Sequence, residues 1–157
     1  MKLKTKLVNV LLLNIFTCST LCITAQLLTI LQGNLDHFIP AMFGMNFGIA
    51  YPIACIVGLF VPAVNFAQAV CVKLKIDRGP LYGIVFTLSI NVIYTLVLST
   101  VMTWFNVMYL NGQSFAVAAA GWLWNFVPMW LLSSLISWVV SGPIGRIAFK
   151  LTGEAEP

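Results

Sequence analysis

The sequence of 157 residues has very little charge: 8% of its residues are Asp, Glu, Lys or Arg, and His occurs once. In an ordinary soluble domain about a quarter of the residues are charged. Because 61% of the residues are hydrophobic, too few polar side chains remain to cover a surface that faces water. This scarcity excludes soluble, disordered and coiled-coil proteins and indicates an integral membrane protein.

Sets of residues that carry chemistry are also missing. The eight Lys and Arg residues form no basic face, so we expect no nucleic-acid partner. No Cys-x-x-Cys pair, Ser-His-Asp set, metal-ligating triad or phosphate-binding glycine loop can be assembled. We interpret the four scattered cysteines as small apolar packing residues: Cys18, Cys22, Cys55 and Cys71. The alternative is that Cys18 and Cys22, one helical turn apart, ligate a soft metal, for which the six methionines would suggest copper. The sequence therefore predicts a protein that is not an enzyme and has no cofactor and no metal site.

Long uncharged stretches place the predicted membrane spans. A helix needs roughly 20 apolar residues to cross a bilayer. Turns or charged residues separate four stretches of that kind, and we expect transmembrane helices at about 7–31, 42–71, 81–110 and 115–141. A cleaved signal peptide is the alternative for the N-terminal residues. Their apolar stretch, however, is longer than the hydrophobic region of a usual signal peptide.

Prolines interrupt two of these stretches. The second contains Pro52 and Pro62, and the fourth contains Pro128 and is followed closely by Pro143. Since proline removes a backbone donor and clashes with the preceding turn of a helix, we expect a kink or a break in each. We expect the fourth span to end at Gly142, with the residues after it near the inner headgroups.

The basic residues indicate the orientation. They fall into three groups, and four crossings place all three on one side of the membrane: Lys2, Lys4 and Lys6; Lys73, Lys75 and Arg78; Arg146 and Lys150. The turns at 33–37 and 111–114, on the other side, contain no Lys or Arg. By the positive-inside rule, we expect both termini to be cytoplasmic.

The two halves of the chain share a weak internal similarity. A shift of 79 residues places Asn46 on Asn125 and the turn residue Gly33 on Gly112. Each half has two predicted crossings, so the halves would be parallel and related by an axis along the membrane normal. We therefore expect an all-α membrane protein of two parallel-repeat helical hairpins, residues 1–78 and 79–157.

Small and polar residues mark the candidate functional faces of the predicted spans. Small side chains let helices approach closely in a membrane, and we interpret six as helix-packing residues: Gly44, Gly48, Ala54, Gly58, Ser133 and Ser137. Two amides stand at the outer ends of these faces, and two aromatic residues correspond between the halves. As the candidate lining of a solute path we take Asn46, Asn125, Tyr51 and Trp130. The alternative is that these four only make packing contacts.

The predicted spans contain no Asp, Glu, Lys or Arg. Proton-coupled carriers usually keep a carboxylate in the membrane. We therefore expect transport or permeation of a small uncharged, zwitterionic or lipophilic-cation solute, in a homodimer because four short helices enclose little space. The alternative function is a noncatalytic membrane subunit or regulator that binds another membrane protein through the same small-residue faces.

A resemblance to known families rests on the last third of the chain. The run from Trp122 to Trp130, followed by Gly142-Pro143 and a basic inner end, resembles repeated two-helix units in a domain-of-unknown-function family of short bacterial inner-membrane proteins. This resemblance implies a location and a repeat, not an activity. In architecture the chain is also similar to the proteobacterial antimicrobial compound efflux family. That family has a glutamate in its first helix, which residues 7–31 lack, so its proton-coupled activity is not carried over.

Overall fold

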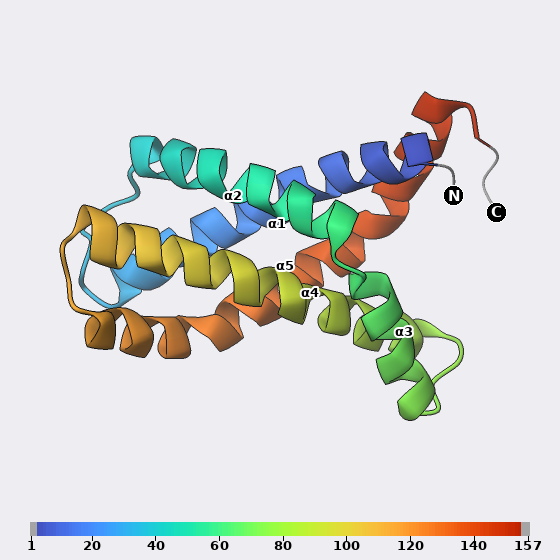
Figure 1. Ribbon diagram of the computed structural model, residues 1–157. Helices are drawn as coiled ribbons and strands as arrows, with labels where there is room; N and C mark the ends of the chain where they lie inside the picture. Colours follow the sequence, from blue (N-terminus) through green and yellow to red (C-terminus); the bar gives the residue numbers. More distant parts are fainter. Residues whose placement is uncertain (1–2, 155–157) are drawn as a thin grey trace.

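The computed structural model describes residues 3–154. Its elements are α1 (Leu3–Leu31), α2 (Pro40–Phe60), α3 (Ala63–Lys73), α4 (Pro80–Thr103), a π-helical segment η1 (Trp104–Leu110) and α5 (Phe115–Thr152) (Figure 1). Four helices are long and apolar enough to span a membrane: α1, α2, α4 continued by η1, and α5. The prediction of an all-helical protein with four candidate membrane spans is confirmed.

The four long helices form a bundle in which neighbours run in opposite directions. Helix α1 packs against α2 and α5, and α4 packs against the same two helices (Figure 1). The beginning of α1 and the end of α5 lie at the same end of the bundle, where the hydroxyl oxygens of Thr5 and Thr152 are 2.7 Å apart. The short α3 packs on α4 near that end. The turns after α1 and η1 lie at the opposite end.

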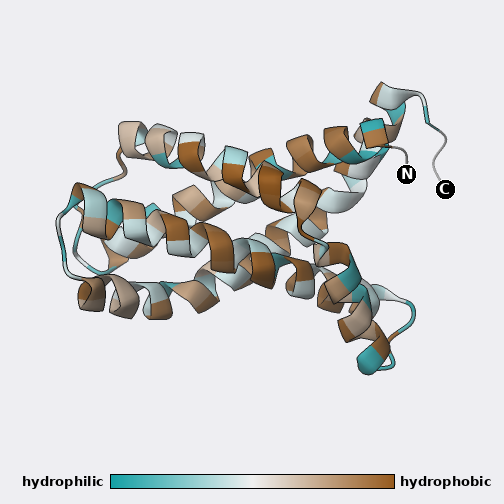
Figure 2. Ribbon diagram, viewed as in Figure 1, coloured by the Kyte–Doolittle hydropathy of each residue, from teal (hydrophilic) through white to brown (hydrophobic). Residues whose placement is uncertain are grey.

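The bundle is apolar outside and partly polar inside. Figure 2 shows hydrophobic residues over the long helices and hydrophilic ones at the turn between α3 and α4. Hydroxyl pairs join helices in the interior: Thr17 lies 3.2 Å from Ser137, and Thr95 lies 3.3 Å from Ser133. Because lipid gives helices no hydrophobic reason to associate, small polar pairs of this kind supply part of the contact between them.

The second predicted span is wrong in its second half. Residues 42–71 do not form one helix, because α2 ends at Phe60 and Val61 is extended, with φ −83° and ψ 128°. The ring of Pro62 disfavours helical backbone at the residue before it. The chain then turns into α3, which packs on α4. The predicted break in this stretch is thus confirmed, and it lies at Val61-Pro62.

The fourth predicted helix, at about 115–141, is also wrong at its end. Helix α5 does not stop at Gly142 but continues through Pro143 to Thr152. Ile144 and Ala148, which follow the proline, are both buried. Helix α5 packs along α1, and this tertiary contact stabilises a helical segment that its proline alone would disfavour.

Candidate functional site

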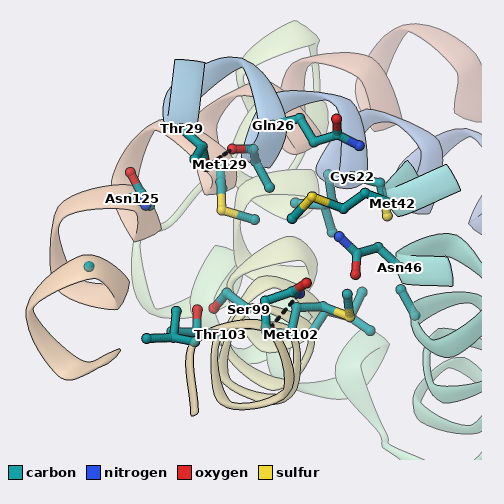
Figure 3. A pocket seen from close by; sticks show the side chains of 17 residues that line it. Cys22, Gln26, Thr29, Met42, Asn46, Ser99, Met102, Thr103, Asn125 and Met129 are labelled. Carbon is teal, nitrogen blue, oxygen red and sulfur yellow. Dashed lines mark hydrogen bonds between the residues drawn. The ribbon is translucent and has the colours of Figure 1, made fainter. Parts of the chain in front are cut away.

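A cavity of about 120 Å³ lies among the four long helices, in the half of the bundle near the turns after α1 and η1. Helices α1, α2, α4 and α5 and the segment η1 all contribute to its wall. Figure 3 shows amide, hydroxyl and sulfur-containing side chains around this space. None of the lining residues is charged, so the cavity offers a ligand hydrogen bonds, contacts with polarisable sulfur and contacts with apolar side chains.

Asn46 is the most unusual residue of the cavity wall. Its side chain points from α2 into the cavity and is 2% exposed (Figure 3). Its buried Oδ1 has no hydrogen-bond partner among the described residues. Most buried polar atoms in proteins do have one, and a missing partner costs about 1–3 kcal/mol. A polar group that enters the cavity would supply that partner.

A second amide oxygen in the wall is also unpartnered. Asn106 in η1 donates a 2.8 Å hydrogen bond from Nδ2 to the carbonyl of Met102, while its buried Oδ1 accepts none within the described chain. The π-helical turn that carries Asn106 is a local departure from α-helical geometry, and such turns are frequent at functional sites. The cavity therefore holds hydrogen-bonding capacity that the protein leaves unused.

Two other amides in the wall, those of Asn125 and Gln26, have hydrogen-bond partners and fix the ends of helices. Gln32 Nε2 donates to Asn125 Oδ1 at 2.8 Å, which joins the end of α1 to α5. Gln26, 1% exposed, accepts from the backbone N–H of Ile39 at 2.9 Å and donates to the Ile39 carbonyl at 3.3 Å. These contacts hold the start of α2 and the end of α1 beside the cavity.

The four residues predicted to line a solute path occupy two kinds of position. Asn46 on α2 and Asn125 on α5 both line the cavity, although they are far apart in the sequence. Tyr51 and Trp130 are not part of its wall. The Tyr51 hydroxyl donates to the Leu11 carbonyl at 3.2 Å, and Trp130 Nε1 donates to the carbonyl of Leu88 at 3.0 Å. The two aromatic residues thus join neighbouring helices.

The residues predicted to pack helices also divide into two sets. Ala54, Ser133 and Ser137 are buried in the bundle. Gly58 is closely surrounded, since a Cβ atom there would collide with the Tyr94 hydroxyl and with Val10. The other two glycines, Gly44 and Gly48, are exposed, and a Cβ at either would meet nothing within 4 Å.

Close packing closes the cavity on the side of the chain ends. The layer beyond the cavity contains the contact of Gly58 with its neighbours and the hydroxyl pairs Thr95–Ser133 and Thr17–Ser137. All of these groups come from the four long helices. A solute in the cavity is therefore separated from that end of the bundle by a layer of small, tightly packed side chains.

Several residues of the wall were not predicted. Gln26, Asn106 and Ser99 are polar residues inside predicted spans, and that placement could have singled them out. Sulfur-containing residues give no such signal, because Cys and Met are common apolar packing residues. Those in the wall are Cys22, Met42, Met102 and Met129. Only the tertiary structure brings them together.

Comparison with known proteins finds no matching family model, curated protein or solved structure. The resemblance to a family of short inner-membrane proteins therefore stays a prediction. Within residues 3–154, no group of three or more His, Cys, Asp or Glu side chains could hold a metal ion. The function has to be argued from the cavity and from the helices around it.

Proposed function

We propose that this chain is a small polytopic inner-membrane protein that lets a small uncharged, zwitterionic or lipophilic-cation solute cross the bilayer. The unpartnered Asn46 amide in the cavity carries this proposal. A solute that hydrogen-bonds to Asn46 recovers the free energy lost when the amide is buried. No protein charge in the wall would compensate a multiply charged solute, which favours solutes with little or no net charge.

The size of the cavity limits the solute. A cavity of about 150 Å³ in another protein accepts one benzene molecule, and the volume here is about 120 Å³. The solute therefore has about the size of benzene or smaller. A larger path would need movement of the helices.

The proposal includes the arrangement in the membrane. We propose that both termini face the cytoplasm and that α1–α2 and α4–α5 are two parallel-repeat hairpins. Lys6 near the start of α1, Lys73 at the end of α3 and Lys150 near the end of α5 belong to one end of the bundle (Figure 1). This grouping supports cytoplasmic termini by the positive-inside rule.

Replacing Asn46 by leucine is expected to reduce permeation to the rate of empty liposomes, because it removes the amide and fills part of the cavity. The purified full-length protein is placed in liposomes, and the swelling rate is followed by light scattering with urea, glycerol, glycine and tetramethylammonium chloride in turn. We expect the wild-type protein to raise the rate for at least one of these probes.

Asn91→Leu is the matched control for this experiment. Asn91 is also a buried asparagine of a membrane-spanning helix, 4% exposed and with an unpartnered Nδ2, but it does not line the cavity. We expect Asn91→Leu to keep the wild-type rate. Wild-type liposomes no faster than empty ones for any of the four probes, or equal loss in the two variants, would contradict the proposal.

Assembly through α2 is the second candidate function, and the open glycine pair supports it. Gly44 and Gly48 are exposed on α2, and a Cβ atom at either position would meet nothing within 4 Å. Small residues at this spacing let two membrane helices approach closely. A second copy of the chain, or another membrane protein that this chain would regulate, could pack there.

Leucine at both Gly44 and Gly48 is expected to convert a homodimer into a monomer, since the larger side chains keep a second helix at a distance. Native mass spectrometry of the protein released from lipid nanodiscs measures the change. Gly142→Leu on α5 is the control, because Gly142 is also exposed and a Cβ atom there would likewise meet nothing within 4 Å. A monomeric wild-type protein would argue against self-association, and a stoichiometric foreign subunit would favour the regulator.

A further inference from the structure

Each of the four long helices contributes one sulfur-containing residue to the cavity wall. Cys22 comes from α1, Met42 from α2, Met102 from α4 and Met129 from α5. Cys22 is 4% exposed and Met129 is 7% exposed. Figure 3 shows these four side chains around the same space as Asn46. Sequence spacing predicts none of this, because the four residues come from different helices.

Thiol and thioether groups are ligands of a particular kind. Soft sulfur ligands select soft metal ions such as Cu(I), whereas Mg²⁺, Ca²⁺ and Mn²⁺ prefer carboxylate, carbonyl and water oxygens. The wall contains one thiol and three thioethers and no carboxylate or imidazole. The other polar groups of the wall are neutral amides and hydroxyls, without the carboxylates that hard ions usually require, so the sulfur-containing side chains make a soft ion the better fit.

The charge of the site favours a monovalent ion. Metal binding removes the proton of a coordinating thiol, so Cys22 would bind as a thiolate and its proton would pass to water. One thiolate and one monovalent ion together carry no net charge. A neutral pair is the arrangement that a wall without charged residues in an apolar bundle can hold.

We propose that the cavity binds one soft monovalent metal ion, Cu(I), through the Cys22 thiolate and the thioethers of Met42, Met102 and Met129. This inference does not depend on the proposed permeation of an organic solute, because metal binding is measured at equilibrium and without transport. It also uses different side chains, since Asn46 is not among the proposed ligands.

The chain supplies its own controls for the sulfur ligands. Met45 lies on α2 close to Met42 but is 39% exposed, and Met108 in η1 is outside the cavity wall. Cys71 on α3 is 1% exposed and also lies outside the wall. These three residues match the proposed ligands in chemistry and differ from them in position.

The test is an anaerobic titration of the full-length protein in nanodiscs with Cu(I), against a chromogenic Cu(I) chelator and with ascorbate as reductant. We expect one ion per chain. Cys22→Ser and each single Met→Leu change at positions 42, 102 and 129 should weaken binding by at least about tenfold, the loss that even outer-shell changes reach at metal sites. Met45→Leu, Met108→Leu and Cys71→Ser should remain within about twofold of the wild type, since they remove no ligand.

Two further measurements keep the proposal falsifiable if a variant does not fold. Copper K-edge absorption of the wild-type protein should show a first shell of sulfur alone. Ag(I) is a redox-stable analogue of Cu(I). One equivalent of Ag(I) should protect Cys22 from alkylation more strongly than Cys71, as measured by peptide mass spectrometry. A shell of nitrogen or oxygen, equal protection of both cysteines, or equal losses in ligand and control variants would overturn the proposal.

The metal site and the solute path can fail separately. Cu(I) binding without permeation of any probe would leave the metal site standing and reject the solute path. Permeation without Cu(I) binding would do the reverse.

Discussion

Gly58→Ala is expected to lower the free energy of unfolding by about 3 kcal/mol, at the upper end of the range for overpacked cores. Gly58 lies where α2 meets α1 and α4. A Cβ atom at this position would lie 2.8 Å from Val10 Cγ1 and still closer to the Tyr94 hydroxyl. Both neighbours are side-chain atoms from other helices, so relief of the collision requires the Tyr94 ring and the Val10 side chain, or α2 itself, to shift within a packed interior.

The measurement is reversible unfolding with SDS in mixed micelles, followed by the loss of tertiary contacts. Gly48→Ala on the same helix is the control, because its Cβ would meet nothing within 4 Å. Alanine in a helix is more favourable than glycine by roughly 0.5–1 kcal/mol, so this variant should be slightly more stable than the wild type. If the two variants changed stability by the same amount, the close contact at Gly58 would be refuted.

Ser133→Leu is expected to destabilise the bundle by at least about 3 kcal/mol, because a large side chain is forced into a packed interior and a buried hydroxyl pair is lost. Ser133 and Thr95 are both 0% exposed, and their hydroxyl oxygens are 3.3 Å apart between α5 and α4. Leucine has no room there unless the two helices separate.

Ser141→Leu is a closely matched control on the same helix. Ser133 and Ser141 each donate a hydrogen bond to the carbonyl of the residue three before, Trp130 at 3.0 Å and Trp138 at 3.1 Å. Ser141 is exposed. The same unfolding experiment should therefore show a change within about 0.5 kcal/mol for Ser141→Leu, as is usual at the surface. A loss of stability at Ser141 equal to that at Ser133 would show that the local hydrogen bond, and not burial, sets the cost.

Both contacts lie in the layer that closes the cavity toward the chain ends. Gly58 joins α2 to α1 and α4, and Ser133 joins α5 to α4. A solute that crosses the membrane by the proposed path must pass this layer. Its opening would need small movements of helices that are now in contact, which are among the usual motions of switching proteins.

The sequence alone determined that the chain is all-helical with four candidate membrane spans. Apolar stretches separated by turns and charged residues are enough for this. In lipid, the backbone N–H and C=O groups must find hydrogen-bond partners within the protein, and few structures other than helices provide them. It also singled out Asn46 and Asn125, since amides are rare in apolar spans and stand out there. Both line the cavity in the structure.

Only the tertiary structure decided how the prolines act and what surrounds the cavity. The chain breaks at Val61-Pro62, where α3 turns away to pack on α4, yet α5 continues through Pro143 because it packs along α1. The aromatic residues Tyr51 and Trp130 join helices outside the cavity wall, while four sulfur-containing residues from four helices enter it. Local sequence sets where helices form, but the rotation and contacts of each helix depend on all its neighbours at once, so these features could not be derived from spacing along the chain.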